Sequence, residues 1–385
     1  MSMLPPPRPL AGLTVIEFAQ YLSGPFAGLK LADLGARVIK VERPGTGDPC
    51  RGLFISDPVG GENTLFHAIN RGKESFAADL RDAGDRAALG DLIAGADVLI
   101  ANFRPGVIER QGFGPDAMRA LNPRLVYGMI SGYGDSDWRA LPGQDLLAQA
   151  RAGLMWLTGS RGDGPMPMGL AVADMLAGEA LAQGILAALV GRGGHGRGAL
   201  VETSLIEALL AFQFEVLTTH LNDGGHLPER AAVAGAHAYV GAPYGVYRTA
   251  DGWLALAMVP SLAALGDLLG VDLAGRDARA ERDAIKALVA QTLAGQGTAQ
   301  WLAVLQPADI WCAEVLDWPA LRASPVWAQL DMEREVTRDG VTLRTVRGPV
   351  RIDGAVPGNG RAAPALGADT ARIRQELAPR HAAQG

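Results

Sequence analysis

Short apolar segments alternate with amphipathic segments along the first third of the chain. Residues 13–18 form an apolar run typical of a buried strand, and a helical pattern follows from Ser23 and stops at Gly35. Parallel sheets covered by helices produce this repeating rhythm, and their ligands bind beyond the carboxyl ends of the strands. Further strands are predicted at 37–41, 75–80, 97–101 and 125–130, with helices at 84–95 and 115–121; later in the chain, residues 200–204 precede another helix that extends to 221.

Asp174 is a carboxylate that stands between two apolar stretches. A loop rich in glycine, proline and methionine precedes it, and a helical pattern extends from it to about residue 191. Burying a charge there is costly without compensation, so Asp174 is predicted either to cap this helix or to serve the chemistry. The two roles are compatible. The positive end of the helix dipole favours an ionised carboxylate, which is the form that attacks an acyl carbon.

The pattern changes near residue 224. Residues 244–256 are predicted as two strands joined by a turn at 250–252, and helical segments then extend to about residue 306. The tail holds an extended stretch at 342–352 and a final helix from about residue 368. We therefore predict a large domain over 1–224, a smaller domain over 225–320, and a C-terminal segment over 321–385 that returns to the large domain.

The composition indicates a soluble globular enzyme. The chain has 385 residues, of which 48% are hydrophobic and 20% charged, and no run approaches the length of a charge-free membrane span. The first eight residues lack the apolar core of a signal peptide. Cys50 and Cys312 show no metal-ligand pattern, which fits a reducing cytoplasm. A net charge of −6 argues against broad nucleic-acid binding but leaves room for an anionic small ligand.

Several familiar site motifs are absent from the sequence. It has no Walker loop, no Gly-x-Gly-x-x-Gly at the first helix and no Gly-x-Ser-x-Gly. The six histidines lack metal-ligand spacing, and His195 is predicted as a solvated loop residue. What remains is a set of basic residues near predicted strand ends, where a nucleotide diphosphate could dock. These residues are Arg43, Arg71, Lys73, Arg104 and Arg110. Periodicity and motifs thus indicate an α/β enzyme with an anionic ligand.

An ordered series of motifs resembles the class III CoA-transferase family, the superfamily of formyl-CoA transferase and alpha-methylacyl-CoA racemase. The resemblance covers nearly the whole chain and is strongest over 9–210. The matching segments are 9–18 with 23–25, 34–42, 45–48, 101–106, 131–134, 196–198 and 364–367.

The resemblance implies a Rossmann-like parallel-sheet large domain that binds CoA, a smaller α+β domain, and ring-shaped subunits interlaced as a homodimer. It implies an acyl-CoA and a small carboxylic acid as partners, with CoA as substrate and product and no permanently bound cofactor, metal, nucleic acid or membrane. Asp174 aligns with the family's nucleophile. Gln20, Tyr21, Leu22 and Ser23 would line the CoA channel, Arg43 and Lys73 would approach the adenosine phosphates, Asn102 and Phe103 the nucleotide, and Arg110 the phosphate region. Gln20 stands where some members carry histidine.

Two departures distinguish this chain from the racemases. Gln144 occupies the position of their acid/base histidine, and Val259 aligns with a glutamate of their second domain. Glutamine does not relay a proton at neutral pH, so CoA transfer is expected and racemisation by alpha-proton exchange is the alternative. Gln144 then becomes a candidate oxyanion donor. Trp156, Met166 and Met168 form either an apolar wall of the site or part of the core, and core packing is favoured.

Overall fold

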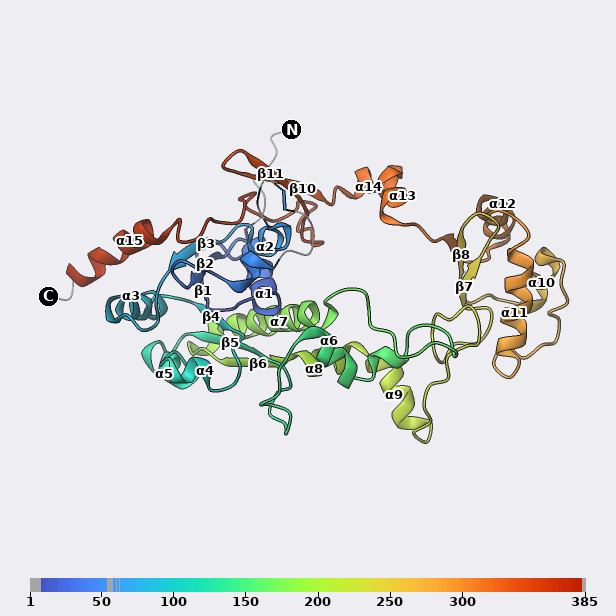
Figure 1. Cartoon of the computed structure of the whole chain (residues 1–385), viewed down its shortest axis with the longest axis horizontal. Coiled ribbons are helices and arrows are strands. Elements are labelled where there is room, and N and C mark those ends of the chain that lie inside the picture. Colours follow the sequence, from blue (N-terminus) through green and yellow to red (C-terminus); the bar gives the residue numbers. More distant parts are fainter. Residues whose placement is uncertain (1–7, 54–57, 60, 62, 383–385) are drawn as a thin grey trace. The chain divides into compact units, whose positions relative to one another are not determined.

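The computed structural model describes residues 8–53, 58–59, 61 and 63–382 (Figure 1). Residues 1–7, on which the expectation about a signal peptide largely rests, lie outside the described part. The chain divides into two compact units. Unit 1 comprises Met1–Ala148, Ala171–Phe212 and Asp331–Gly385, and unit 2 comprises Gln149–Leu170 and Gln213–Leu330. These boundaries differ from the predicted ones at 224 and 320, because unit 2 also takes in 149–170, 213–224 and 321–330.

A six-stranded parallel sheet forms the centre of unit 1, in the order β3-β2-β1-β4-β5-β6. This confirms the predicted α/β class and the parallel sheet. The order reverses between β1 and β4, so the connections after these two strands leave in opposite directions, and sheets of this kind bind their ligands at the carboxyl ends of such strands. The strands are β1 (Thr14–Glu17), β2 (Arg37–Glu42), β3 (Glu74–Ala77), β4 (Val98–Ala101), β5 (Val126–Ser131) and β6 (Leu200–Ser204).

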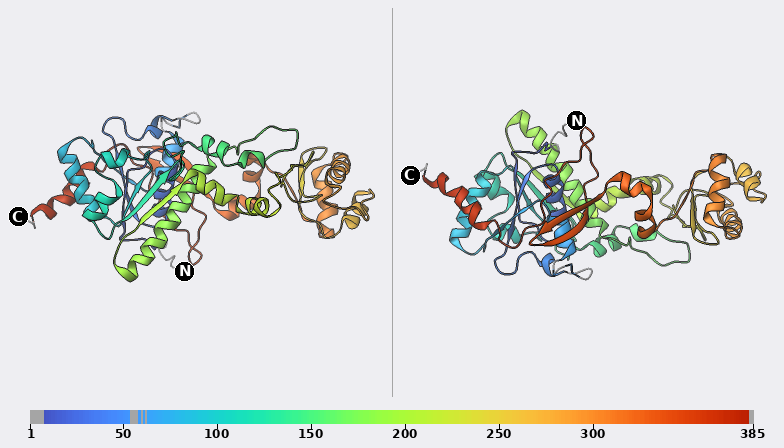
Figure 2. Two further views of the ribbon diagram at one scale, coloured as in Figure 1. Left: turned by 90° about the horizontal axis from the view of Figure 1, so that it is seen from below. Right: turned by 90° about the horizontal axis from the view of Figure 1, so that it is seen from above.

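Helices cover both faces of this sheet (Figure 1, Figure 2). Side chains alternate along a strand, so Tyr127 packs into the cluster with Leu89 of α3 (Ala83–Ala94). On the opposite face, a side chain at Gly128 would press on Ile185 of α7 (Val172–His195). Other helices of unit 1 are α1 (Ser23–Asp33), α2 (Thr64–Asn70), α4 (Val107–Arg110), α5 (Pro115–Leu121), α8 (Leu205–Phe212) and α15 (Thr370–Ala382), while α6 (Asp145–Arg151) crosses into unit 2.

α7 is long and apolar enough to cross a membrane by length and composition alone. It nevertheless packs against α1, α8, β5 and β6 inside unit 1, as the core helix of a globular domain does. The helix continues through His195 and ends at Gly196 in a left-handed conformation. His195 is therefore an exposed residue of the last helical turn and not the loop residue that we predicted.

Unit 2 contains a three-stranded antiparallel sheet, in the order β7-β8-β9. The predicted hairpin is confirmed by the pairing of β7 (Gly245–Arg248) with β8 (Trp253–Leu256). The third strand, β9 (Cys312–Glu314), was not predicted, because three residues carry too little periodicity. The helices of unit 2 are α9 (Phe214–Asn222), α10 (Leu262–Leu269), α11 (Arg282–Leu293), α12 (Thr298–Leu305), α13 (Trp318–Ala323) and α14 (Pro325–Leu330).

The C-terminal part of unit 1 begins with an antiparallel hairpin of β10 (Glu333–Arg338) and β11 (Val341–Val346). β11 falls in the stretch predicted as extended from residue 342. β10 escaped prediction because Val336 is its only apolar residue among alternating charged and polar ones. In the structure Val336 and Leu343 pair across the hairpin, and both are buried.

Candidate active site

Residues that are far apart in the sequence meet at the carboxyl ends of β1 and β4. Asn102 follows β4, and its amide oxygen accepts the backbone N–H of Gln20, which follows β1, at 2.8 Å. The amide nitrogen of Asn102 donates to the Gln20 carbonyl at 2.8 Å and to the Ser23 hydroxyl at 3.2 Å. Three of the predicted site residues thus form one hydrogen-bonded group at the point where the strand order reverses.

The structure places Asp174 in the first turn of α7, two residues after its start, with Ala171 at the N-cap. The prediction that Asp174 caps the helix is therefore wrong. The cap comes from Asp145, the first residue of α6, whose Oδ1 accepts the backbone N–H groups of Ala173 at 2.7 Å and Asp174 at 3.4 Å. A carboxylate from another helix satisfies these amides, so the side chain of Asp174 is not used as the cap.

Close packing of α1 on α7 brings Asp174 to Ser23. Gly178 lies one helical turn after Asp174 and so shares its face of the helix. A Cβ at Gly178 would lie 2.6 Å from the carbonyl oxygen of Ser23. The missing side chain therefore permits the two helices to approach closely. Ser23 is only 5% exposed, and its side chain lies close enough to the Asp174 carboxylate to lower the pKa of that group.

The environment of Asp174 opposes ionisation. Burial raises its pKa to about 6, the charge of Asp145 adds to the rise, and the hydrogen bond from Ser23 counteracts it. We expected the helix dipole to favour the ionised form, but desolvation and a neighbouring carboxylate outweigh it. At pH 7 the ionised form still predominates. A carboxylate whose pKa lies near neutrality is a stronger base than an ordinary aspartate, and such groups cluster at functional sites.

Gln144 immediately precedes α6, and its side chain is exposed. The backbone before it lies against the end of β5, where a Cβ at Gly143 would come within 2.5 Å of the Cα of Gly132. Only two glycines permit that approach. Their contact fixes the segment that carries Gln144 and Asp145 relative to the sheet.

Tyr21 adopts a left-handed backbone conformation, with a φ of 60°. Such a conformation is strained for a bulky residue and persists only where its surroundings enforce it. The Tyr21 N–H donates to Asp48 at 3.1 Å, and Asp48 in turn pairs with the fully buried Lys40 at 2.8 Å. The Tyr21 side chain is 51% exposed. Sequence reasoning missed this buried support, because nothing local to the strand that contains Lys40 shows that its ammonium pairs with Asp48.

Lys73 does not lie where the resemblance implied. It is fully buried, and its ammonium donates to Glu17 at 2.7 Å, to the Pro25 carbonyl at 2.8 Å and to Asn70 at 2.9 Å. An ammonium has three protons, and all three are used within the protein. Burial lowers the pKa of Lys73 to about 8, against the opposing effect of Glu17. Lys73 therefore presents no proton to a phosphate in this structure, and its position is that of a structural ion pair.

The other predicted cations differ from Lys73. Arg43 follows β2 and Arg110 ends α4, and both are exposed. Arg71 instead forms an ion pair with Asp33. The two apolar site candidates are anchored by packing: Leu22 lies against the buried cluster around Phe66, and Phe103 lies against the cluster that contains Phe113.

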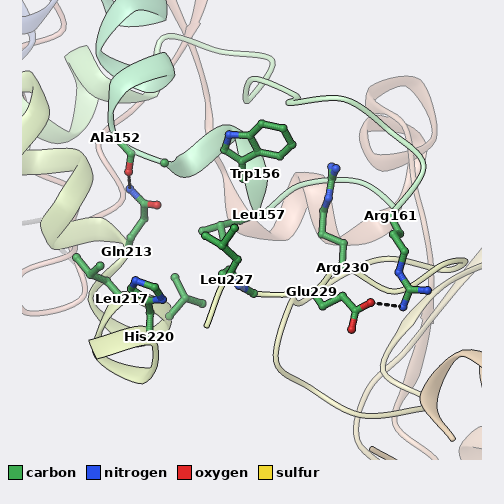
Figure 3. A pocket seen from close by; sticks show the side chains of 13 residues that line it. Ala152, Trp156, Leu157, Arg161, Gln213, Leu217, His220, Leu227, Glu229 and Arg230 are labelled. Carbon is green, nitrogen blue, oxygen red and sulfur yellow. Dashed lines mark hydrogen bonds and ion pairs between the residues drawn. The ribbon is translucent and has the colours of Figure 1, made fainter. Parts of the chain in front are cut away.

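A separate pocket of about 470 Å³ lies wholly within unit 2 (Figure 3). Trp156 lines it and is 59% exposed, so the favoured prediction of core packing is wrong for this residue. Arg161 and Glu229 line the pocket and form an ion pair at 2.9 Å, and Arg230 lines the pocket as well (Figure 3). Met166 is 40% exposed and, like Met168, is not among the residues that line the pocket.

No metal-binding cluster is present in the part of the chain that the structure describes, where no three His, Cys, Asp or Glu side chains gather around a common point. Cys50 is buried and Cys312 half-buried, and neither forms a disulfide.

Comparisons with known proteins identify the family of this chain. The model of CoA-transferase family III matches residues 10–370. The chain is 35% identical over 387 residues to the acetyl-CoA:oxalate CoA-transferase of Acetobacter aceti, covering 97% of each chain. It is 33% identical over 390 residues to the succinate–glutarate CoA-transferase of Agrobacterium fabrum, covering 96% of each. It also resembles the crystal structure of a CaiB/BaiF family protein from Brucella suis, with a TM-score of 0.83 and 30% identity over 96% of this chain and 100% of that one. The chain belongs to CoA-transferase family III.

Proposed function

We propose that this chain transfers CoA from an acyl-CoA thioester to an acceptor carboxylic acid, with Asp174 as the covalent nucleophile. Family membership supports CoA transfer as the class of reaction. One observation carries the choice of Asp174. Its half-buried carboxylate lies next to Ser23, where Gln20 and Asn102 meet, and its pKa is raised to about 6. A partly desolvated carboxylate that is still ionised at pH 7 is suited to attack an acyl carbon.

The proposed reaction balances without ATP or a redox partner. The Asp174 carboxylate attacks the donor thioester carbon, forming a mixed anhydride and expelling CoA thiolate. The thiolate attacks the Asp174 acyl carbon, which forms an aspartyl-CoA thioester and releases the donor acid. The acceptor carboxylate then attacks the same carbon and expels the thiolate. The thiolate finally takes the acceptor acyl group and restores the Asp174 carboxylate.

In these steps the protein stabilises the negative charge that develops and holds the CoA thioester in place. Each attack creates a tetrahedral oxyanion, which needs hydrogen-bond donors in fixed positions. Gln144 and backbone N–H groups of the glycine-rich loops are proposed donors for the oxyanions on the substrate acyl carbons. We further propose that Tyr21, Leu22, Asn102 and Phe103 line the CoA channel, and that Arg43 and Arg110 bind its phosphates. Lys73 is left out of this set because its ammonium is fully bound inside the protein.

The relatives narrow the range of acids to be tested. One is named for acetyl-CoA and oxalate and another for succinate and glutarate. We propose short carboxylic acids, dicarboxylates among them, as donor and acceptor, and an interlaced homodimer of ring-shaped subunits in the cytoplasm as the working form. A screen of paired dicarboxylic, aromatic and branched acids against their CoA thioesters measures the preference directly.

Trapping the intermediate tests the nucleophile. The protein is incubated with an acyl-CoA and then treated with hydroxylamine or borohydride, and its peptides are analysed by mass spectrometry. The proposal predicts modification at Asp174 and none in the Asp174→Asn variant. An unmodified Asp174 in an active enzyme contradicts it. The racemase alternative predicts exchange of the acyl alpha-proton with deuterated solvent in the absence of any acceptor acid, so the same incubation in deuterium oxide separates the two reactions.

A further inference from the structure

The Ser23 hydroxyl lies between Asn102 and Asp174. What each of these side chains can donate or accept determines where the hydroxyl proton points. Asn102 is fixed by two opposed bonds to Gln20, in which its oxygen accepts the N–H and its nitrogen donates to the carbonyl. Reversing the amide would break both bonds, so its nitrogen must face Ser23. That nitrogen donates to the Ser23 oxygen at 3.2 Å. With a lone pair of the hydroxyl engaged by Asn102, its proton is directed to another acceptor.

The Asp174 carboxylate is the acceptor that faces Ser23, because Asp174 lies one turn before Gly178 on the face of α7 that packs closely against Ser23. An ionised carboxylate only accepts hydrogen bonds, so Ser23 is the donor in this pair. The carbonyl oxygen of Ser23 is held next to Gly178, one turn further along α7, which fixes the distance between the two helices. Gly24 supports the same arrangement, since a Cβ there would lie 3.3 Å from the side-chain carboxamide carbon of Asn102.

We propose that Ser23 is a catalytic residue that stabilises the oxyanion formed on Asp174 itself, with Asn102 as the positioning residue that aims its proton. This inference rests on the proposed function. When one oxygen of Asp174 becomes part of an anhydride or is replaced by sulfur, the other remains as a carbonyl oxygen beside Ser23. Attack by CoA thiolate or by the acceptor carboxylate forms a bond to the Asp174 acyl carbon and moves the carbonyl π electrons onto that oxygen. Collapse returns the electrons and expels the carboxylate or thiolate, and no proton is gained or lost.

A hydrogen bond to the oxyanion strengthens as its charge develops, so it speeds the reaction more than it stabilises the resting thioester. Ser23 is expected to act in two of the four proposed steps, namely those in which the Asp174 acyl carbon is attacked. Attack by Asp174 on the substrate acyl carbon places its oxyanion on another atom and does not need Ser23. This difference makes the inference testable.

The test measures the discharge of the aspartyl-CoA thioester in a single turnover. The full-length enzyme is loaded with acetyl-CoA and freed of excess substrate, and an acceptor acid selected in the screen is then added with rapid quenching. We expect Ser23→Ala to slow discharge about 10²-fold, which is the usual effect of removing one oxyanion donor. Ser23→Thr retains the hydroxyl and should restore most of the rate. Ser324→Ala is the matched control, because the Ser324 hydroxyl donates only to the Leu321 carbonyl in unit 2.

The outcomes separate this inference from the proposed function. Discharge of Ser23→Ala at the wild-type rate, or of Ser23→Thr as slowly as Ser23→Ala, overturns the role of Ser23 while leaving Asp174 as nucleophile. Absence of any aspartyl thioester in the wild type overturns the proposed function and this inference with it. If Ser23→Ala fails to fold, Asn102→Ala is measured in the same way. A smaller slowing of discharge than that expected for Ser23→Ala should be seen, and an unchanged discharge rate overturns the proposal.

Discussion

Asp145 accepts the backbone N–H of Asp174 at 3.4 Å, so one carboxylate holds the start of the helix that carries the other. Oδ1 of Asp145 also accepts the Ala173 N–H at 2.7 Å, which makes it the cap of α7. Its negative charge adds to the effect of burial in raising the pKa of Asp174. Asp145 therefore affects both the position of Asp174, the proposed nucleophile, and its pKa.

Replacing Asp145 with asparagine separates these two effects. Asparagine keeps an oxygen that accepts the amide protons, but it removes the charge, so the pKa of Asp174 falls from about 6. The acid limb of the kcat/KM profile, which reports the free enzyme, should move to lower pH. Asp145→Ala also loses the cap and should lower the free energy of unfolding by about 1 kcal/mol. Asp135→Asn, at a side chain that is 97% exposed, is the control. Coincident pH profiles for Asp145→Asn and the wild type would rule out the charge effect.

Asp174→Asn should abolish CoA transfer and yet stabilise the protein at neutral pH. The folded pKa of Asp174, about 6, lies above its ordinary value of 3.8, so the folded state binds the proton more tightly than the unfolded state. Its destabilising effect is absent below pH 3.8 and fully developed above pH 6. Chemical unfolding at pH 8 should show a gain of about 1 to 3 kcal/mol for the variant. That gain should shrink as the pH approaches 4. A gain of the same size at both pH values would refute the raised pKa.

Gly178→Ala should impair the site without touching a substrate. The added Cβ meets the Ser23 carbonyl oxygen at 2.6 Å, so α7 must move away from α1 and the Ser23 contact to Asp174 lengthens. A displacement near 1 Å at a reacting group lowers kcat by about 10²-fold. Gly193→Ala lies on the same helix, where a Cβ meets nothing within 4 Å, and should retain full activity. Equal kcat values for the two variants would show that the close helix contact is unimportant.

Lys73 should contribute to the stability of the fold, whereas Arg43 should contribute to binding of acyl-CoA. Lys73→Met leaves Glu17 buried without one of its two lysine partners, and breaking a buried pair in this way destabilises a protein by about 3 to 5 kcal/mol. Arg43→Ala removes an exposed charge and should leave unfolding unchanged within about 0.5 kcal/mol. It should instead raise the KM for acyl-CoA about fivefold. A stable Lys73→Met enzyme with weakened CoA binding would restore the role that the resemblance implied.

The sequence was a good guide to the sheet because its strands are buried on both faces and read as continuous apolar runs. The runs at 13–18, 97–101 and 125–130 correspond to β1, β4 and β5. Gln20 and Asn102 were named through the family resemblance, and the structure brings them together beyond the ends of β1 and β4. The unit boundaries were predicted less well, because 149–170 lies between two segments of unit 1 in the sequence, and its glycine- and proline-rich part predicts a loop of the large domain.

Long-range contacts explain what the sequence alone did not show. Asp174 has the residue type and position of a cap, but the capping carboxylate comes from Asp145, 29 residues earlier. Lys73 looks like a strand-end surface charge, and only its pairing with Glu17, 56 residues away, reveals that it is buried. The support of Tyr21 by Asp48 likewise joins two loops. Local patterns carry no information about such pairs.

The most direct test of covalent catalysis follows an oxygen atom. The enzyme turns over with an acyl-CoA and an acceptor acid whose carboxylate carries the heavy isotope of oxygen, and the peptide that contains Asp174 is then weighed. Attack of the acceptor on the aspartyl thioester leaves one acceptor oxygen in the regenerated carboxylate, so the account predicts heavy oxygen at Asp174 and at no other carboxylate. An active enzyme whose Asp174 stays unlabelled after many turnovers would contradict it.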